Sequence, residues 1–211
     1  QIEPVLFFAP DSYWYAGKRI GVGEKVAAVM ARMPSVRTAL LVDYLGVAGE
    51  VAKAAPRAEP LAAALSRFVP AEVTFERLPF SHPLYILYSS GTTGIPKCIV
   101  HSVGGTLIQH LKVHRLHCGI VEGDRFFYFT TCGWMMWNWQ VSALAAGATL
   151  VLYDGAPLPA AEPELLWRLA ASASVNVFGT SAKYLALAAK EGLAPRERHA
   201  LPALRAVLST A

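Results

Sequence analysis

A stretch rich in glycine and hydroxyl residues, 88–97, carries the residue types in this chain best suited to binding phosphate. It reads Tyr-Ser-Ser-Gly-Thr-Thr-Gly-Ile-Pro-Lys and follows the apolar run 84–88. Glycine lets the backbone approach a ligand closely, and successive backbone amides form a concave anion site. Hydroxyl groups donate hydrogen bonds to phosphate oxygens, and Lys97 adds a mobile positive charge. We therefore predict that this stretch binds the phosphates of a nucleotide.

Other motifs of phosphate binding or nucleophilic catalysis do not fit the same residues. A Walker A loop requires Gly-x4-Gly-Lys-Ser/Thr, whereas Gly91 and Gly94 are three residues apart and Cys98 follows the lysine. There is no Gly-x-Gly-x-x-Gly fingerprint, and no Gly-x-Ser-x-Gly elbow that would make Ser89 or Ser90 a nucleophile. The alternative is a Ser/Gly turn without a chemical role. The complete string, with its lysine and a preceding strand, favours the phosphate loop.

Residues 89–97 resemble the phosphate-binding loop of the adenylate-forming enzymes, which include acyl-CoA synthetases, luciferases and peptide-synthetase adenylation domains. The similarity continues along nearly the whole chain, through His101-Ser102, Gly104-Gly105, Gly123-Asp124-Arg125, Thr131-Cys132-Gly133-Trp134 and Gly147-Ala148-Thr149. Within that superfamily the chain is most similar to the acetoacetyl-CoA synthetases. The segments that indicate this subfamily are 13–18, 97–101, 133–139 and 178–184.

The resemblance implies a role for each matching residue. ATP phosphates would be held by Ser89, Ser90, Gly91, Thr92, Thr93, Gly94 and Lys97. Lys97 would be the catalytic residue, stabilising the charge that grows as pyrophosphate leaves. Trp134 would lie beside the acyl and coenzyme A channel, although Thr131-Cys132 precede it where many relatives have an aspartate and an aliphatic residue. Met136 stands where relatives acting on acetate tend to have a hydroxyl residue. His101 is a further candidate for ligand contact, with packing an equal alternative.

Several other residues have structural interpretations that we favour. His110, His114 and His117 have i, i+4, i+7 spacing and are followed by Cys118, which suggests metal ligands. No carboxylate lies in that helix and its other charges are positive, so we predict no metal site here. Trp137 and Trp139 are expected in the core of a helix. Ser181, with Thr180, is expected to cap a helix rather than bind a ligand.

Composition excludes several classes of protein. The chain is 54% hydrophobic and 16% charged, which fits a buried core and argues against disorder. Its net charge of +4 includes no basic block, so we expect neither a nucleic acid nor a membrane-surface partner. Residues 126–153 carry no charge, but polar residues interrupt them and no membrane span is predicted. Three cysteines without a Cys-x-x-Cys pair indicate a reduced, cytoplasmic protein.

Apolar periodicity predicts an α/β fold with a mostly parallel sheet and flanking helices. Helices are expected near 26–33, 104–116, 135–145, 165–171 and 181–190, with short helices in 46–72. Strands are expected at 38–42, 75–78, 84–88, 99–100, 126–129, 149–153, 175–178 and 204–208. Ligands of such sheets bind beyond the carboxyl ends of strands, and the phosphate loop follows the strand that ends at Tyr88.

The chain stops directly after an apolar strand, which predicts a fragment. By resemblance it is part of the large N-terminal adenylation domain, and the small C-terminal domain is absent. Residues 1–80 would be an N-terminal portion, and residues 81–211 would carry the phosphate loop and the acyl/CoA channel. Residues for Mg²⁺, for the ribose and a second catalytic lysine would follow residue 211. We therefore expect these 211 residues to be inactive alone.

The function predicted for the parent is ATP-dependent ligation of a short-chain acid to coenzyme A through an acyl-adenylate, with release of pyrophosphate and then AMP. Acetoacetate is the acid favoured by the resemblance. An acetyl- or propionyl-CoA synthetase is the nearest alternative, and a peptide-synthetase adenylation domain is a more distant one. A nucleotide-binding module without catalysis and a structural fragment without ligand affinity are alternatives of other classes.

Overall fold

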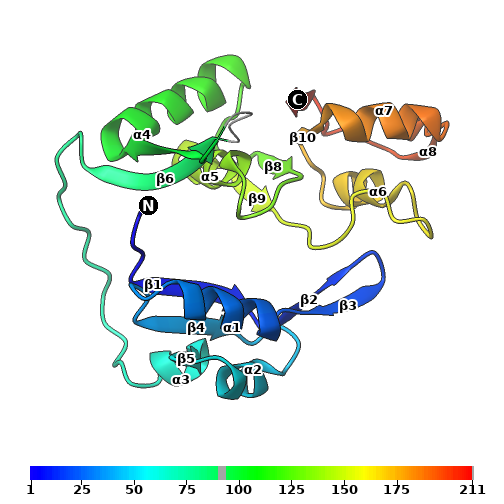
Figure 1. The fold of residues 1–211 in the computed structure, drawn as a ribbon. Coiled ribbons are helices and arrows are strands. Elements are labelled where there is room, and N and C mark those ends of the chain that lie inside the picture. The colour runs from blue at the N-terminus through cyan, green and yellow to red at the C-terminus, as the bar shows by residue number, and fades with distance from the viewer. Residues whose placement is uncertain (90–93, 211) are drawn as a thin grey trace. The chain divides into compact units, whose positions relative to one another are not determined.

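The computed structural model describes residues 1–89 and 94–210 of the chain. The chain divides into two compact units, residues 1–75 and 76–211, each of which is treated separately below. Figure 1 shows the course of the chain through both units. None of the described helices is long and apolar enough to cross a bilayer.

The first unit is a small parallel sheet with helices and one hairpin. Its sheet has the order β1 (Leu6–Pro10), β4 (Thr38–Val42), β5 (Ala58–Pro60). Its helices are α1 (Gly23–Arg32), α2 (Ala48–Ala54) and α3 (Leu61–Leu65), and its hairpin is β2 (Ser12–Tyr15) with β3 (Lys18–Gly21). Helical spacing places Val26 and Met30 of α1 in a core with Leu41 of β4, which confirms the helix and strand predicted there.

A buried carboxylate connects β1 to the segment before α2. Asp11 is 0% exposed, and its oxygens accept hydrogen bonds from the backbone N–H groups of Tyr44, Leu45 and Val47. These donors satisfy a charge whose burial would otherwise be unfavourable. Asp11 therefore has a structural role in this unit.

The second unit contains a four-stranded parallel sheet. The order of its strands is β11 (Ala206–Thr210), β10 (Val177–Ser181), β8 (Arg125–Tyr128), β9 (Thr149–Val151). Its helices are α4 (Val103–Lys112), extended by the π-helical turn Val113–His117, α5 (Met135–Ser142), extended by the 3-10 turn Ala143–Ala146, α6 (Leu165–Ser172), α7 (Ala182–Lys190) and α8 (Pro195–Arg198). These elements confirm the predicted α/β class with its flanking helices.

Both faces of this sheet are covered by hydrophobic clusters. Successive strand residues point to opposite faces, so Phe126 joins the cluster that contains Trp139 of α5, and Phe127 joins the cluster that contains Trp167 of α6. The Trp167 ring stacks on Phe178 with a centroid distance of 4.5 Å. The uncharged run 126–153 therefore contains the buried strand β8 and a helix that packs one side on the core, as expected for a sheet covered on both faces.

The strands around the predicted phosphate loop are arranged differently from the prediction. β6 (Pro83–Ser89) and β7 (Lys97–Ser102) form an antiparallel pair, which is separate from the parallel sheet among the described residues. The prediction that the loop follows a strand of the parallel sheet is therefore wrong. Only residues 90–96 join the two strands, which is too few for the crossover that parallel neighbours require.

Other boundaries differ for identifiable reasons. No strand forms at 75–78, where Phe75 is 89% exposed and has no neighbouring strand. β10 and β11 each begin two residues later than predicted. Val175 and Leu204 are apolar because they pack against the core from the segments preceding these strands. Burial there does not require a strand.

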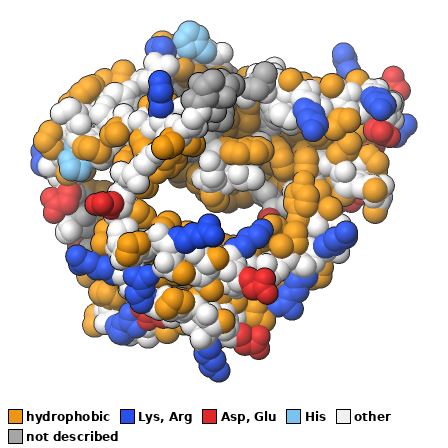
Figure 2. All heavy atoms as spheres, in the orientation of Figure 1, with side chains coloured by type: hydrophobic (Ala, Val, Ile, Leu, Met, Phe, Trp, Pro, Cys, Tyr) orange, Lys and Arg blue, Asp and Glu red, His pale blue; other side chains and the backbone are white. Residues whose placement is uncertain are grey.

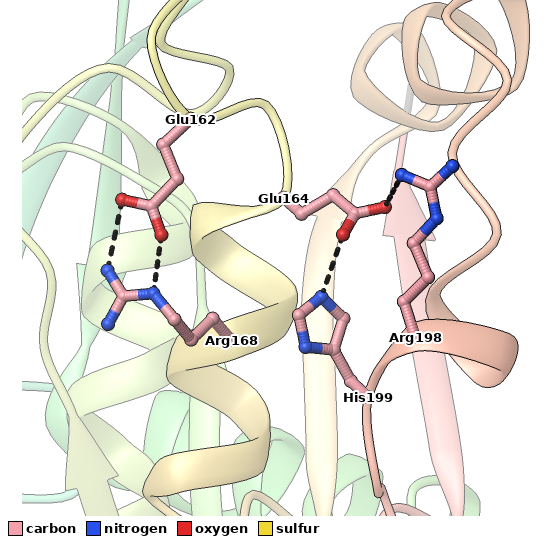
Figure 3. A network of polar contacts seen from close by, with 5 residues as sticks. All are labelled: Glu162, Glu164, Arg168, Arg198 and His199. Atoms are coloured by element: carbon pink, nitrogen blue, oxygen red, sulfur yellow. Dashed lines mark hydrogen bonds and ion pairs between the residues drawn. The ribbon is translucent and has the colours of Figure 1, made fainter.

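Surface ion pairs connect α6 to the segment around α8. Glu164, directly before α6, accepts hydrogen bonds from Arg198 at 3.0 Å and His199 at 3.1 Å (Figure 3). A separate pair joins Glu162 to Arg168 of α6. An exposed pair such as Glu162–Arg168 contributes little stability, about 0–1 kcal/mol. On the face seen in Figure 2, Lys and Arg side chains are interspersed with Asp and Glu and with apolar groups.

Candidate functional site

The β6–β7 hairpin brings the two described ends of the predicted phosphate loop together. Ser89, the last residue of β6, lies directly opposite Lys97, the first residue of β7. Cα atoms of opposite residues in antiparallel strands are about 5 Å apart. Lys97 is exposed, so its ammonium group is available to a ligand held by the loop. One hydroxyl and one cation thus flank the connection.

The rest of the loop is only partly described. Gly94 is exposed and has a φ of +119°, a backbone conformation that favours glycine. The candidate residues Ser90, Gly91, Thr92 and Thr93 lie outside the described residues. Their assignment to ATP phosphates remains a prediction.

A cavity of about 810 Å³ lies in the second unit, beside the strand that begins with Lys97. We refer to it as the α4 cavity. Five elements line it. One side is formed by α4 and its extension, through Gly105, Thr106, Gln109, His110 and Val113, and by α5, through Met135, Met136 and Trp139. The strands contribute Val100, His101 and Ser102 of β7, Tyr128 of β8 and residues 207–210 of β11, and Cys118 also lines the cavity. Its volume falls in the range of about 300–1,000 Å³ typical of small-molecule sites.

His101 connects the phosphate hairpin to this cavity. Its ring lies against the Tyr85 ring, with a centroid distance of 4.9 Å, and it lines the cavity. Four residues along β7 separate it from Lys97, which corresponds to about 13 Å of strand. His101 therefore both packs and borders the cavity, so the two alternatives left open by the sequence are compatible.

Trp134 directly precedes α5 and is 58% exposed, and it is not among the residues lining the α4 cavity. Within α5, the residues that do line the cavity are Met135, Met136 and Trp139. Trp139 is 7% exposed and belongs to the core, which confirms the prediction made for it. A role for Trp134 in a coenzyme A channel stays a prediction.

Ser142 of α5 joins two histidines from the facing helix. Its Oγ lies 2.9 Å from His110 Nδ1, 2.9 Å from His114 Nε2 and 2.6 Å from the Trp139 carbonyl oxygen. Burial lowers the pKa of His114 to about 4. Burial, followed by the nearby His101, lowers the pKa of His110 as well. Both imidazoles are therefore neutral at pH 7.

The three histidines do not share one face. His110 and His114 are buried, whereas His117 is exposed beyond the π-helical turn that interrupts the α-helical spacing. Among the described residues, no three His, Cys, Asp or Glu side chains are grouped as metal ligands. The hydrogen bonds to Ser142 account for the burial of the first two.

Some cavity residues were not identified from the sequence. Thr106 and Gln109 line the wall formed by α4, and Ser209 and Thr210 line it from β11. The available signal was polar residues placed among apolar ones in α4, and for His110 only metal binding, packing and exposure were considered. Ser181, by contrast, caps α7 by accepting a 3.2 Å hydrogen bond from the backbone N–H of Tyr184, as predicted.

Known proteins are similar to this chain over its whole length. An acetoacetyl-coenzyme A synthetase from Rhizobium meliloti (strain 1021) is 52% identical over 210 residues, which are 100% of this chain and 32% of that protein. A malonamoyl-CoA synthetase from Penicillium aethiopicum is 38% identical over 228 residues, again covering 100% of this chain and 32% of the relative.

A solved structure, the acetoacetyl-CoA synthetase from Streptomyces lividans, matches with a TM-score of 0.88 and 41% identity over 100% of this chain and 31% of that one. The chain thus spans about a third of the length of these relatives. Residues 3–211 match the family described as AMP-binding enzyme. The chain therefore belongs to the AMP-binding enzyme family.

Proposed function

We propose that the protein containing this chain ligates acetoacetate to coenzyme A at the expense of ATP. The observation that carries the proposal is the 52% identity, over the whole chain, to a relative named acetoacetyl-coenzyme A synthetase. In the first step the carboxylate attacks the α-phosphorus of ATP and expels pyrophosphate, which leaves an acyl-adenylate. In the second step the thiol of coenzyme A attacks the acyl carbon and expels AMP.

Lys97 and the loop hydroxyls would act on the phosphates. Displacement at phosphorus requires positioning and charge neutralisation more than a protein nucleophile. Lys97, opposite Ser89 at the mouth of the hairpin, would neutralise the charge that develops on the departing pyrophosphate. Support for this role comes from the exposed position of Lys97 and from the hydroxyl-rich connection it adjoins.

The α4 cavity would hold the acyl group. Its walls combine apolar residues of α5 with a few polar side chains from α4 and β11, which suits a short acid with one polar substituent. The cavity lies along β7, the strand that starts at Lys97, so one strand would serve both the phosphate and the acyl subsites.

Mg²⁺ and coenzyme A would depend mainly on residues outside this chain. No Asp or Glu occurs between Glu76 and Glu122, so the residues around the loop lack the carboxylates that Mg²⁺ favours. No step is assigned to Mg²⁺ on these residues. Trp134 is proposed to border the coenzyme A channel, on the strength of its exposed ring at the start of α5.

A reduced, cytoplasmic location is proposed from the cysteines. Among the described residues, Cys98, Cys118 and Cys132 form no disulfide. Disulfides form and persist in oxidising compartments, where a chain with three cysteines and no disulfide would be unusual. Fatty-acid and lipid metabolism is the corresponding proposed role, since acetoacetyl-CoA is a short acyl thioester.

The test is product formation by the full-length protein with ATP, Mg²⁺ and coenzyme A. We expect acetoacetyl-CoA and AMP in equal amounts, with acetate and propionate as poorer acids. Malonamate is included because one relative is named for malonamoyl-CoA. Acyl-CoA formation led by another acid would overturn the choice of acetoacetate. ATP binding without any product would support a nucleotide-binding module.

A further inference from the structure

His110 is a nearly buried polar residue in the wall of the α4 cavity, which it shares with both polar and apolar side chains. It is 8% exposed and lines the α4 cavity together with Val113, Met136 and Trp139. A polar group placed in such a wall lowers affinity for a purely aliphatic ligand, because the ligand leaves it without a partner. The contact with Ser142 uses only Nδ1 of His110, so the second ring nitrogen, Nε2, is left for a polar atom of a ligand.

The proton positions around Ser142 determine what His110 offers. The 2.6 Å distance between Ser142 Oγ and the Trp139 carbonyl oxygen requires a hydrogen between them, and only the serine hydroxyl can supply it. The serine oxygen can then only accept from His110 Nδ1 at 2.9 Å. A neutral His110 therefore carries its proton on Nδ1 and has a lone pair on Nε2.

The Nε2 atom of His110 is the polar atom left for the cavity. It has no hydrogen-bond partner among the described residues. His114 Nδ1 is fully buried and has no hydrogen-bond partner in the described part of the chain. His110 Nε2 is not fully buried in this way. A small polar group entering the cavity can thus reach it.

We propose that His110 is a specificity-determining residue of the acyl site, which recognises an oxygen on the third carbon of the acid through the lone pair on Nε2. The 3-oxo oxygen of acetoacetate is also an acceptor, so a water molecule donates one hydrogen to each of them. Butyrate has the same number of carbons but no such acceptor, and it leaves this water unsatisfied. The inference rests on the proposed function.

The experiment compares kcat/KM for adenylation of acetoacetate and of butyrate by the full-length protein. We expect wild type to prefer acetoacetate. The variants His110→Leu and His110→Phe should lower kcat/KM for acetoacetate about tenfold and leave butyrate unchanged or improved, so that the ratio falls about tenfold or more. Both variants are made so that, if one of them does not fold, the other still tests the role of His110.

Two controls separate specificity from general damage. A folding defect lowers both rates together and leaves their ratio unchanged. Met136→Leu alters the same cavity without removing a polar atom, so its ratio should stay within about threefold of wild type. Ser142→Ala removes the hydrogen-bond partner of His110 Nδ1. It should reduce the acetoacetate-to-butyrate ratio, but by less than His110→Leu does.

The outcomes distinguish the two proposals. An unchanged acetoacetate-to-butyrate ratio in an active His110 variant overturns the role of His110 and leaves the proposed function intact. Failure of wild type to activate acetoacetate at all overturns the proposed function. If Met136→Leu lowers the acetoacetate-to-butyrate ratio as much as the His110 variants do, the selectivity comes from cavity shape. That result would also overturn the role of His110.

Discussion

Lys97 is the only Lys or Arg between Arg77 and Lys112, so the charge at the mouth of the β6–β7 hairpin depends on it. Its position was evident from the sequence, because the lysine ends a recognisable string of glycines and hydroxyl residues. The hairpin adds that Lys97 lies directly opposite Ser89. A hydroxyl and a cation facing each other across one strand pair form the described part of the predicted phosphate site.

Replacement of this charge tests the role directly. Lys97→Ala in the full-length protein should lower acetoacetate-dependent pyrophosphate exchange about 100-fold or more, as removal of a group that stabilises developing charge does. Lys112→Ala is the matched control, since Lys112 is also exposed but lies at the end of α4 rather than beside the glycine-rich connection. A loss below about threefold for Lys97→Ala would remove Lys97 from the catalytic machinery.

Residue types alone did not identify the roles of His110 and Ser142. Their interaction depends on α4 and α5 packing side by side, which joins residues 32 positions apart. From the sequence, histidines at helical spacing suggested a metal site, and the alternative of packing could not be given partners. The partners became clear only from the helix–helix contact.

At the scale of elements, close packing of β8 against β10 depends on one glycine. A Cβ atom at Gly179 would lie 1.9 Å from the Tyr128 ring. That ring is held by its neighbours, since Trp139 lies 5.8 Å away between centroids and the Tyr128 hydroxyl donates to the Thr180 carbonyl at 3.3 Å. The glycine therefore allows an aromatic ring to cross the neighbouring strand.

Gly179→Ala should consequently destabilise the second unit by about 1–3 kcal/mol, the usual effect of overpacking. Urea unfolding of the full-length protein measures this. Gly49→Ala is the control, because Gly49 is an exposed helical position with free space around it and alanine favours helix. Equal midpoints for Gly179→Ala and wild type would show that Tyr128 moves aside without loss.

The contact between α4 and α5 should make stability depend on pH. Burial lowers the pKa of His114 from 6.5 to about 4. Between these values the unfolded chain binds a proton that the folded chain does not, so stability decreases as pH falls from 6.5 towards 4. The loss approaches about 3 kcal/mol for this group, and the lowered pKa of His110 adds to it in the same direction.

Urea unfolding of wild type and His114→Gln at pH 7 and pH 5 measures this effect. We expect the variant to lose less stability than wild type between the two pH values, whatever its stability at pH 7. Identical losses would mean that His114 is not the group responsible.

Sequence reasoning predicted most elements, because apolar periodicity reports burial. It placed Thr38–Val42 as a strand and α7 as a helix at nearly their observed bounds. It failed where a buried apolar residue lies outside any strand, as at Val175, which is buried but precedes β10. The direction of the strands was not predicted either. The antiparallel pairing of β6 with β7 depends on the length of the connection between them.

At the scale of the whole molecule, the chain provides about a third of the length of its relatives. The part present contains the phosphate hairpin and the α4 cavity, but no carboxylate near the loop. Both half-reactions require positioned groups around all reacting atoms. An isolated third of the protein should therefore lack complete catalytic geometry.

We accordingly expect no acetoacetyl-CoA from the 211-residue chain alone under conditions in which the full-length protein is active. The measurement is thioester formation at matched concentrations, with circular dichroism to establish that the chain is folded. ATP added to the folded chain gives a separate readout, a shift in melting temperature if nucleotide binding is retained. Turnover by the isolated chain would contradict the need for the remaining residues.

The central claim is that this chain helps to form an acyl-adenylate from acetoacetate. The most direct test is ATP–pyrophosphate exchange by the full-length protein, without coenzyme A, across acetoacetate, acetate, propionate, butyrate and amino acids. The account predicts exchange that requires an acid and is fastest with acetoacetate. Exchange led by another acid would contradict the substrate, and no exchange with any acid would contradict adenylate formation itself.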